Sequence, residues 1–481
     1  MEKHIFLLIL LFLIQFSISL ASSNETDQQA LLAFQNLITS PTHFFANNWT
    51  KNTSFCSWFG VTCTPKRQRV VALALPNLQL QGTISTSLAN LSFLSVLNLQ
   101  NNNFRGGIPY ELGHLPRLRV IDIQNNQLNG SIPTSLFQHQ RVQVISLAFN
   151  ELGGEMWKGP WYVPELRVLD LTNNNLTGII PPSVGNATKM MNFSLSGNRV
   201  SGNIPKEVGN LSQLADLSLT DNQLTGTIPT NLGNLHELRL LLLHHNQLTN
   251  EPRERELLFF HSLADCKMLK YLQVGFNLLN GVLPNSIGNL SSTIQNFEIG
   301  DAHINGLIPT GISNMSGLMT LDFQGNNLTG NIPSDVGKLK QLQGLYLNNN
   351  KLQGHIPQAV CHLSNLVQLF LNGNELSGLI PECLGNLSML QKLSLGSNKF
   401  SSKFPLSLWK MSGLLYLDVS QNSIEGEVPS DIGGMKAIVE LYLYSNHFSG
   451  MIPTRFGELQ NLQRKESPKM LNRYWRSGLI I

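Results

Sequence analysis

The amino-acid sequence predicts an α/β solenoid, a chain wound into about sixteen similar turns. The first observation is a pattern that returns every 24 residues from Val71 onward. The second is a short alternation of leucine with other residues at the start of each copy, which is typical of a strand with one buried face. The third is Gly-x-Ile-Pro at a fixed distance after that strand, which indicates a turn.

The copies share the template x-x-L-x-L-x-x-N-x-L-x-G-x-I-P-x-x-L-G-x-L-x-x-L. Successive copies after the one at Val71 start at Ser95, Arg119, Gln143, Arg167, Met191, Ala215 and Arg239. The register slips once after the copy at Arg239, and the pattern resumes from Gln295 through Val439. No copy can bury its leucines alone, so stacking of neighbouring turns has to supply the core.

Each position of the template has a physical role, which the copy around Leu345 illustrates. We expect its leucines to point inward from a strand of a parallel sheet. Asn350 follows the strand, where its amide can satisfy backbone groups and form a ladder with the copies above and below. Gly354 permits a positive φ angle, and Ile-Pro favours an extended corner. The remaining residues are expected to cover the back as a short helical turn.

The N-terminus predicts a secretory signal peptide over residues 1–21. A basic start precedes an apolar run from Ile5 to Ile14, and Ser19 and Ala21 occupy the positions of a cleavage site. The alternative is an uncleaved anchor. No later run of about 18 apolar residues occurs, so we expect no membrane span in this chain. A charged fraction of 13% and a net charge of +3 argue against a nucleic-acid partner.

Thirteen Asn-x-Ser/Thr acceptor motifs agree with an extracellular location. An Asn- and Ser-rich repeat produces such motifs by chance, so each site is only a candidate for glycosylation. The acceptor residues are Asn24, Asn48, Asn52, Asn90, Asn129, Asn175, Asn186, Asn192, Asn210, Asn289, Asn314, Asn327 and Asn386.

The repeats, through L-x-G-x-I-P, resemble plant-type leucine-rich repeats. The preceding segments DQQALLAFQNLI and NWTKNTSFCSWFGVTC resemble the N-terminal cap of plant leucine-rich-repeat receptor-like kinases. The resemblance covers roughly residues 26–462, and SLADCKMLKYL with LPNSIGNLSS further resembles the subfamily that senses microbial patterns. It implies a right-handed leucine-rich-repeat solenoid with a parallel concave sheet. We therefore divide the chain into a signal peptide (1–21), a cap (22–69), a solenoid (70–462) and a tail without repeats (463–481).

The cysteines give two further expectations. In the cap that this sequence resembles, the pair corresponding to Cys56 and Cys63 forms a disulfide; the alternative is two free thiols. Cys361 and Cys383 occupy successive turns, so stacking can bring them within bonding range. The alternative for this second pair is two independent small core residues.

The outward positions of the strands form the predicted ligand surface, because alternate strand residues face opposite sides. Leucines, histidines and aromatic residues are unexpected on a solvated sheet and are the anchors that a bound peptide or protein uses. The alternative is scattered surface apolarity. A glycan on Asn192 would move a ligand toward later turns. The candidate ligand-binding residues are Leu240, Leu242, His244, His245, Tyr271, Phe276, Tyr346, Phe370, Tyr416, Tyr442 and Tyr444.

Three irregular segments depart from the template. After Asn246 the chain reads QLTNEPRERELLFFHSLADCKML, a charged insertion that we expect to be a solvated bulge; the alternative is a binding loop. The aromatic residues Trp157, Trp161 and Tyr162 are expected to fill the core rather than form an exposed patch. Ala302 replaces the ladder asparagine and should weaken the ladder locally.

No motif indicates catalysis. The chain lacks a Gly-x-Ser-x-Gly elbow, a Walker loop, His-Glu-x-x-His and the kinase signatures. We expect neither a cofactor nor a metal, since the adjacent His244 and His245 have no evident third ligand.

The outward surface and the resemblance together predict the extracellular part of a receptor-like kinase that binds a peptide or protein. The resemblance further implies pattern recognition in immunity and ligand-driven pairing with a co-receptor kinase. We expect the chain to be truncated or spliced before the membrane span and the kinase. The alternative is a soluble secreted binder, such as an inhibitor of a cell-wall-degrading enzyme or a decoy receptor.

Overall fold

The structure of the chain is a computed structural model, which describes residues 25–41, 45, 48–50, 53–156 and 159–463. The predicted signal peptide, the acceptors Asn24 and Asn52, Trp157 and residues 464–481 of the tail lie outside the described residues. The chain forms two compact units, residues 1–225 and residues 226–481. The division into signal peptide, cap, solenoid and tail stays a prediction.

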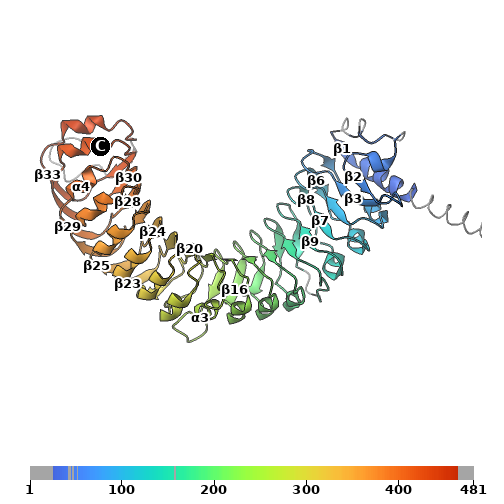
Figure 1. Cartoon of the computed structure of the whole chain (residues 1–481), viewed down its shortest axis with the longest axis horizontal. Coiled ribbons are helices and arrows are strands. Elements are labelled where there is room, and N and C mark those ends of the chain that lie inside the picture. Colours follow the sequence, from blue (N-terminus) through green and yellow to red (C-terminus); the bar gives the residue numbers. More distant parts are fainter. Residues whose placement is uncertain (1–24, 42–44, 46–47, 51–52, 157–158, 464–481) are drawn as a thin grey trace, which may run out of the picture. The chain divides into compact units, whose positions relative to one another are not determined.

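Each unit contains a long parallel sheet, to which every repeat contributes one strand of mostly three residues (Figure 1). In the first unit these strands are β3(Val70–Ala74), β5(Val96–Asn98), β7(Val120–Asp122), β9(Val144–Ser146), β11(Val168–Asp170), β13(Asn192–Ser194) and β15(Asp216–Ser218). In the second they are β17(Leu240–Leu242), β19(Tyr271–Gln273), β20(Asn296–Glu298), β22(Thr320–Asp322), β24(Gly344–Tyr346), β26(Gln368–Phe370), β28(Lys392–Ser394), β30(Tyr416–Asp418) and β32(Glu440–Tyr442). The predicted solenoid of repeated turns with a parallel sheet is confirmed.

Equivalent residues of neighbouring repeats lie side by side in the long sheets. Asp322 pairs with Tyr346, which pairs with Phe370, and the same register continues along the strands of the second unit. The strand leucines, such as Leu345, are fully buried, while the residues on either side of them stay partly accessible. The register therefore arranges the outward side chains in continuous rows.

A second set of short strands follows the first, which the sequence analysis did not predict. It arises where the residues after the ladder asparagine pair with their copies in the next turn, as Gln353 pairs with Glu375. These strands are β4(Gln81–Gly82), β6(Asn103–Gly106), β8(Gln127–Leu128), β10(Gly153–Glu155), β12(Asn175–Thr177), β14(Ser201–Asn203), β16(Gln223–Thr227), β18(Gln247–Thr249), β21(Asn305–Gly306), β23(Asn327–Asn331), β25(Lys351–Gly354), β27(Glu375–Gly378), β29(Lys399–Lys403), β31(Ser423–Glu427) and β33(His447–Ser449).

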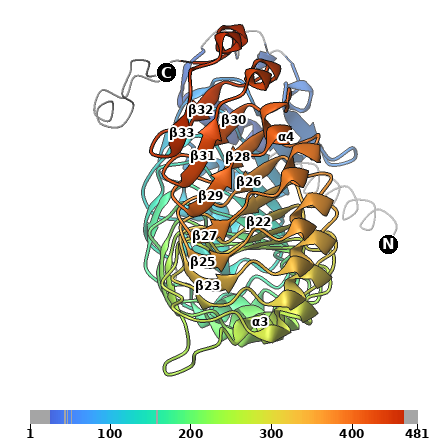
Figure 2. The same ribbon diagram turned by 90° about the vertical axis from the view of Figure 1, so that its left-hand side faces the viewer.

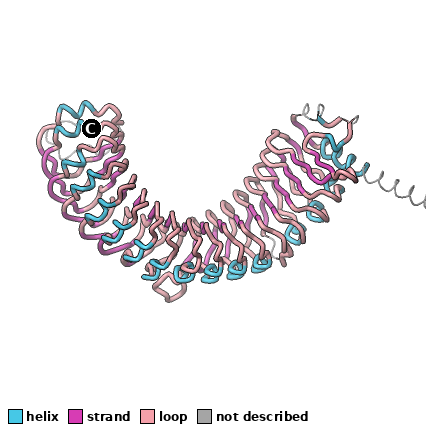
Figure 3. Tube along the Cα trace, viewed as in Figure 1, coloured by secondary structure: helices cyan, strands magenta, loops and turns pink. Residues whose placement is uncertain are grey.

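The back of each unit carries the expected short helical turns, most of them 3₁₀ helices that begin directly after a proline (Figure 3). In the second unit, α4 and its equivalents lie along one border and β29, β31 and β33 toward the other (Figure 2). The helices are η1(Phe55–Ser57), η2(Thr86–Asn90), η3(Tyr110–His114), η4(Thr134–Gln138), η5(Pro182–Asn186), η6(Lys206–Asn210), η7(Thr230–Asn234), α3(Phe259–Leu263), η8(Asn285–Asn289), η9(Thr310–Asn314), η10(Ser334–Lys338), η11(Gln358–His362), η12(Glu382–Asn386), α4(Leu406–Trp409), η13(Ser430–Gly434) and η14(Thr454–Glu458).

The ladder asparagines hold consecutive turns together. Nδ2 of Asn350 donates to the carbonyl oxygen of Phe323 in the preceding turn at 2.9 Å and to that of Leu347 in its own turn at 3.2 Å. Its Oδ1 accepts from the amide of Leu328 at 3.0 Å. Asn374 repeats the same contacts one turn later. Each ladder asparagine therefore satisfies backbone groups that the bend leaves without strand partners.

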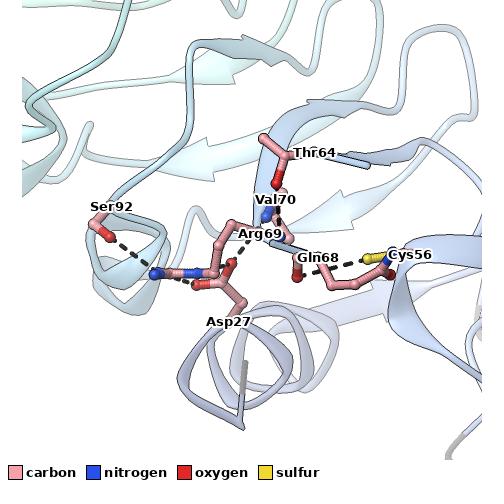
Figure 4. Close-up of polar contacts among 7 residues, drawn as sticks. All are labelled: Asp27, Cys56, Thr64, Gln68, Arg69, Val70 and Ser92. Carbon is pink, nitrogen blue, oxygen red and sulfur yellow. Dashed lines mark hydrogen bonds and ion pairs between the residues drawn. The ribbon is translucent and has the colours of Figure 1, made fainter. Parts of the chain in front are cut away.

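A buried ion pair joins the N-terminal cap to the first repeat (Figure 4). Residues 25–35 are helical, and the fully buried Asp27 on this helix accepts from Nε and Nη2 of Arg69 at 3.0 and 2.8 Å. Asp27 also accepts from the amide of Val70, the first residue of β3, at 2.9 Å. Arg69 further donates to Ser92 Oγ at 2.9 Å. These contacts satisfy the buried carboxylate and fix the helix on the first strand.

Two disulfides are present. Cys56 in η1 is bonded to Cys63, the last residue of β2(Val61–Cys63), and Cys361 in η11 is bonded to Cys383 in η12 of the next turn. Trp49 stacks on Trp58 at 5.1 Å between ring centroids, and both are buried in the cap. In the irregular segment, Trp161 is fully buried against Phe137, as expected. The same expectation is wrong for Tyr162, which is exposed.

We expect Asn350→Ala to lower the free energy of unfolding by roughly 2–4 kcal/mol. The substitution leaves the Leu328 amide and the Phe323 carbonyl of the preceding turn without their side-chain partner. The matched control is Asn365→Ala, which removes an exposed amide with a single bond to the Lys340 carbonyl. Chemical denaturation measures both variants, and hydrogen exchange of the Leu328 amide reports the lost bond directly. Equal stability of the two variants would contradict the ladder role.

Candidate functional site

The outward side chains of the long sheet form a surface that we call the strand face. In the second unit, four aromatic residues lie in sequence on it: Tyr346 on β24, Phe370 on β26, Tyr416 on β30 and Tyr442 on β32. Their ring centroids are separated by 5.4, 6.2 and 5.8 Å in that order, and each ring is half-buried by its neighbours. We call these residues the aromatic row.

Small residues allow the aromatic row to form. Gly344 lies under the Tyr346 ring, because a Cβ at that position would come within 2.7 Å of Tyr346 Cε2. β28 places Ser394 between Phe370 and Asp418 in the register, and the Tyr416 ring approaches Phe370 across this turn. Two small side chains thus turn separate aromatic positions into one continuous apolar strip.

Two hydroxyl groups of the aromatic row donate hydrogen bonds to neighbouring side chains. The Tyr346 hydroxyl donates to Gln368 Oε1 at 3.0 Å, and that of Tyr442 donates to Glu440 Oε2 at 2.9 Å. Burial, followed by the charge of Asp418, raises the pKa of Tyr416 to about 12. Burial, followed by the charges of Asp322 and Glu298, raises that of Tyr346 as well. The row therefore offers apolar ring surface with polar tips, a combination common at protein interfaces.

A second group of candidate ligand-binding residues lies at the start of the second unit. Leu240 and Leu242 on β17 are half-buried, whereas Tyr271 on β19 is 38% exposed. His245 and Phe276 occupy the bend after these strands, where their rings stack at 4.2 Å with an interplanar angle of 7°. His244 contacts His245 at 5.4 Å between ring centroids.

The bend places His245 and Phe276 in an unusual backbone conformation. Their φ angles are 55° and 50°, in the left-handed region, which asparagine, aspartate or glycine occupies in most other turns. A bulky aromatic residue is strained there, and such strain often occurs at functional sites. Phe276 is also 42% exposed. The sequence analysis selected His245 and Phe276 as outward residues of the strand, but their side chains leave the bend and not the strand.

Acidic residues occupy the turns between the two groups. Glu298 on β20 lies beside Asp322 on β22 in the register, and Asp322 lies beside Tyr346. Burial raises the pKa of Asp322 to about 6, with smaller contributions from the charges of Glu298 and Asp301. The amide of Gln324 and its Nε2 donate to the two Asp322 oxygens at 3.0 and 3.2 Å and oppose this rise only in part. The sequence analysis did not select these three carboxylates.

The structure places the predicted ligand-binding residues in these two groups of the second unit, with Tyr444 next to Tyr442 at the end of the strand face. Their role in binding stays a prediction. The charged insertion lies elsewhere: Glu256 forms a bridge with Val282 beside the second set of strands, and residues 252–256 are exposed. Tyr162 in the first unit is 60% exposed beside the buried Trp161.

The described glycosylation candidates remain accessible on the surface. Asn192 lies on β13 and is half-buried on the strand face of the first unit. Asn48 and Asn327 are also half-buried, and the exposed candidates are Asn90, Asn129, Asn175, Asn186, Asn210, Asn289, Asn314 and Asn386. Glycan attachment at these residues stays a prediction. Within the described residues, no helix is both long and apolar enough to cross a membrane.

Family comparisons identify the cap and the repeats. The model of the leucine rich repeat N-terminal domain matches residues 24–64. The Leucine Rich Repeat model matches residues 93–115, 117–139, 165–187, 213–235, 317–339, 341–363, 365–387 and 413–435. Both matches agree with the resemblance seen in the sequence.

Several proteins with sequences similar to part of this chain are plant receptor kinases. The chain is 46% identical over 81 residues to the LRR receptor-like serine/threonine-protein kinase EFR of Arabidopsis thaliana, covering 17% of this chain and 8% of that protein. The match thus spans less than a tenth of the length of this curated relative.

Solved structures extend the similarity over most of the chain. The PEPR1–AtPEP1 structure aligns with a TM-score of 0.81 at 30% identity, over 91% of this chain and 64% of that one. The structure of the Arabidopsis receptor kinase HAESA with the peptide hormone IDA and the co-receptor SERK1 aligns with a TM-score of 0.54 at 27% identity, over 92% and 89%.

We expect Asp322→Asn to stabilise the protein at pH 7 by about 1–2 kcal/mol, after discounting for the partial exposure of the carboxylate. Its pKa is about 6 in the folded chain against 3.8 without the fold, so the folded state binds more protons between these values. The unfolding free energy of the wild type therefore falls as pH rises from about 4 through about 6. Asparagine does not titrate, so the variant lacks this loss of stability. Denaturation of both proteins from pH 4 to 7 measures it. If the difference in unfolding free energy between the variant and the wild type does not grow with pH, the raised pKa of Asp322 is wrong.

Proposed function

Since the chain is a leucine-rich-repeat protein whose curated relatives are plant receptor kinases, we propose that it is an extracellular ectodomain that binds a peptide or protein ligand. The ligand lies on the strand face of the second unit, between Phe276 and Tyr442. The chain acts by binding and not by catalysis. Its location is the apoplastic side of the plasma membrane, either free or at the cell surface.

The aromatic row is the observation that carries this proposal. Four rings follow one another over the five turns from β24 to β32 and make a continuous apolar strip on the outward face of the sheet. Aromatic residues that combine apolar area with a polar tip dominate the binding energy of peptide and protein interfaces. An extended peptide that runs across the strands can contact the rings in succession.

A co-receptor and an immune role are the finer parts of the proposal. The HAESA structure contains a peptide hormone and the co-receptor SERK1, which supports a ligand-dependent partner kinase for this chain too. The segments SLADCKMLKYL and LPNSIGNLSS, which resemble the subfamily that senses microbial patterns, support a microbial ligand. The first segment ends within the strand β19 and includes Tyr271, and the second segment follows that strand.

We expect Tyr346→Ala and Phe370→Ala each to weaken peptide binding about 10-fold, because truncation of a central aromatic anchor typically costs 1–2 kcal/mol or more. The probe is a peptide selected from a random display library against the wild-type chain, and isothermal calorimetry measures its affinity. Tyr162→Ala is the matched control, since it removes an exposed tyrosine outside the strand face. Equal affinities of all three variants would place the ligand elsewhere.

The immune role predicts that the chain depletes a microbial elicitor. We expect a bacterial extract to lose its ability to trigger an oxidative burst in leaf tissue after passage over the immobilised wild-type chain. Passage over a Tyr346→Ala/Phe370→Ala column should leave the activity largely in the extract. If the wild-type column removes no activity yet binds peptides from plant extracts, the ligand is a plant peptide and the microbial assignment is wrong.

A further inference from the structure

Two neighbouring bends of the first unit consist entirely of amide residues. The bend after β5 reads QNNN over residues 100–103, and the bend after β7 reads QNNQ over residues 124–127. One amide of each bend, that of Asn102 or Asn126, is the ladder asparagine and bonds to the backbone. The other six side chains are exposed or half-buried. Other turns have glycine at equivalent positions, as at Gly300 and Gly373, so the fold does not require these amides.

Hydrogen bonds align the amides in rows across the turns. Nε2 of Gln124 donates to Oε1 of Gln100 at 3.0 Å. Nδ2 of Asn125 donates to Oδ1 of Asn101 at 2.8 Å, and Asn101 in turn donates to Oδ1 of Asn77 at 2.8 Å. Every donor points toward the preceding turn, and such a chain of hydrogen bonds polarises its members. The carbonyl oxygens of Gln124 and Asn125 therefore end the two rows as acceptors.

Phe149 interrupts the asparagine row at the next turn. Its φ angle is 54°, in the left-handed region where a bulky aromatic residue is strained, and it is 52% exposed. Both neighbours in the row turn away from the ring. Asn125 bonds to Asn101 on one side, and on the other Asn173 leans over Gly197, where a Cβ would come within 2.0 Å of its Oδ1. Among the described residues Phe149 contacts no other aromatic ring, so its surface is available to a ligand.

A hollow of about 410 Å³ adjoins the asparagine row. Asn101 and Asn125 line it together with Gln79, and none of its lining residues is charged. The strands β5, β7, β9 and β11 beside the bends contain no lysine, arginine or histidine, and their charged residues are Asp122 and Asp170. The row and the hollow thus offer neutral hydrogen-bonding groups next to one apolar ring.

These groups match the chemistry of a sugar ring. An amide side chain donates and accepts at once, which suits the adjacent hydroxyl groups of a pyranose. The C–H face of the same sugar is apolar and can pack on the Phe149 ring. An anionic ligand would need positive charges, and a peptide would need several apolar anchors, which these bends lack. A concave polar surface with one aromatic platform therefore favours an uncharged carbohydrate.

We infer that this surface binds a neutral oligosaccharide through Gln100, Asn101, Gln124, Asn125 and Phe149. One sugar stacks on the Phe149 ring, and the amides hold the hydroxyl groups of the sugars that follow. The row from Asn77 to Phe149 covers three turn spacings, roughly 14 Å, which accommodates several linked sugars. The site lies in the first unit and is separate from the peptide ligand proposed for the second.

Two sources can supply such a carbohydrate. One is a free polysaccharide fragment outside the cell. The other is a glycan on Asn192 of the same chain, because Asn192 lies on β13, two strands beyond β9, whose bend carries Phe149. Comparison of the wild type with Asn192→Gln distinguishes the two sources.

The test uses the full chain produced in plant cells, with cellohexaose, xylohexaose and chitohexaose as probes in calorimetry. Phe149→Asn removes the ring and introduces the residue that the neighbouring bends have at Asn125 and Asn173, so the bend keeps its conformation. Asn125→Gly removes one amide at a position where glycine accepts the positive φ angle. The matched control is Asn349→Gly, the same change at a φ angle of 55° in the second unit.

We expect at least one hexamer to bind the wild type and Asn349→Gly with equal affinity. Phe149→Asn should weaken this binding about 10-fold or more and Asn125→Gly about 3-fold. Phe149→Asn should unfold at the same temperature as the wild type or a higher one, because it relieves strain.

Two results would overturn the carbohydrate site: equal binding by Phe149→Asn and the wild type, or no binding by either the wild type or Asn192→Gln. If a hexamer binds only to Asn192→Gln, the attached glycan occupies the site. Adding Phe149→Asn to that variant should then abolish binding, and binding that persists would also refute the site.

Discussion

The structure depends on the asparagine that leaves each strand. A tight bend after three strand residues exposes backbone groups to a leucine core that offers no hydrogen-bond partners, and burial without partners would be costly. The amide of Asn374 resolves this by donating to its own turn and to the preceding one, and by accepting from the Leu352 amide of that preceding turn. Stacking and bending are thus satisfied by the same side chain, and the leucines can pack without polar residues among them.

One consequence is that the outward side chains of the strand face do not have to hold the turns together. The inward leucines and the ladder hold the turns, so the outward positions can change without loss of the fold. The two units use this freedom differently. β11 and β13 of the first unit present Asp170, Asn192 and Ser194, whereas the second unit presents aromatic residues on β24, β26, β30 and β32. A surface that changes composition while the backbone stays constant is suited to recognition.

The sequence predicted the parts of the structure that repeat. The strand leucines, the asparagine bend, the proline before most helical turns and the outward direction of Tyr346 all follow from periodicity. It could not predict contacts that depend on single neighbours in space. The stacking of Phe370 and Tyr416 requires the small Ser394 on the strand between them, and the pair of Asp27 and Arg69 joins residues that no periodic pattern relates. Phe276 was selected as a strand residue, although its exposure comes from the left-handed bend.

The unfavourable features of the second unit gather in the same turns. The turn of β20 lacks the ladder asparagine, since Ala302 is buried in its place, and Asn326 of the next turn alone accepts from the amides of Ala302 and Ile304. This turn also carries Glu298 and Asp301, while the preceding bend carries the strained Phe276. Packing alone would favour asparagine, neutral side chains and glycine at these positions. The charges of Glu298 and Asp301 and the strained Phe276 add nothing to the core, which is the pattern expected where a surface is shaped by what it binds.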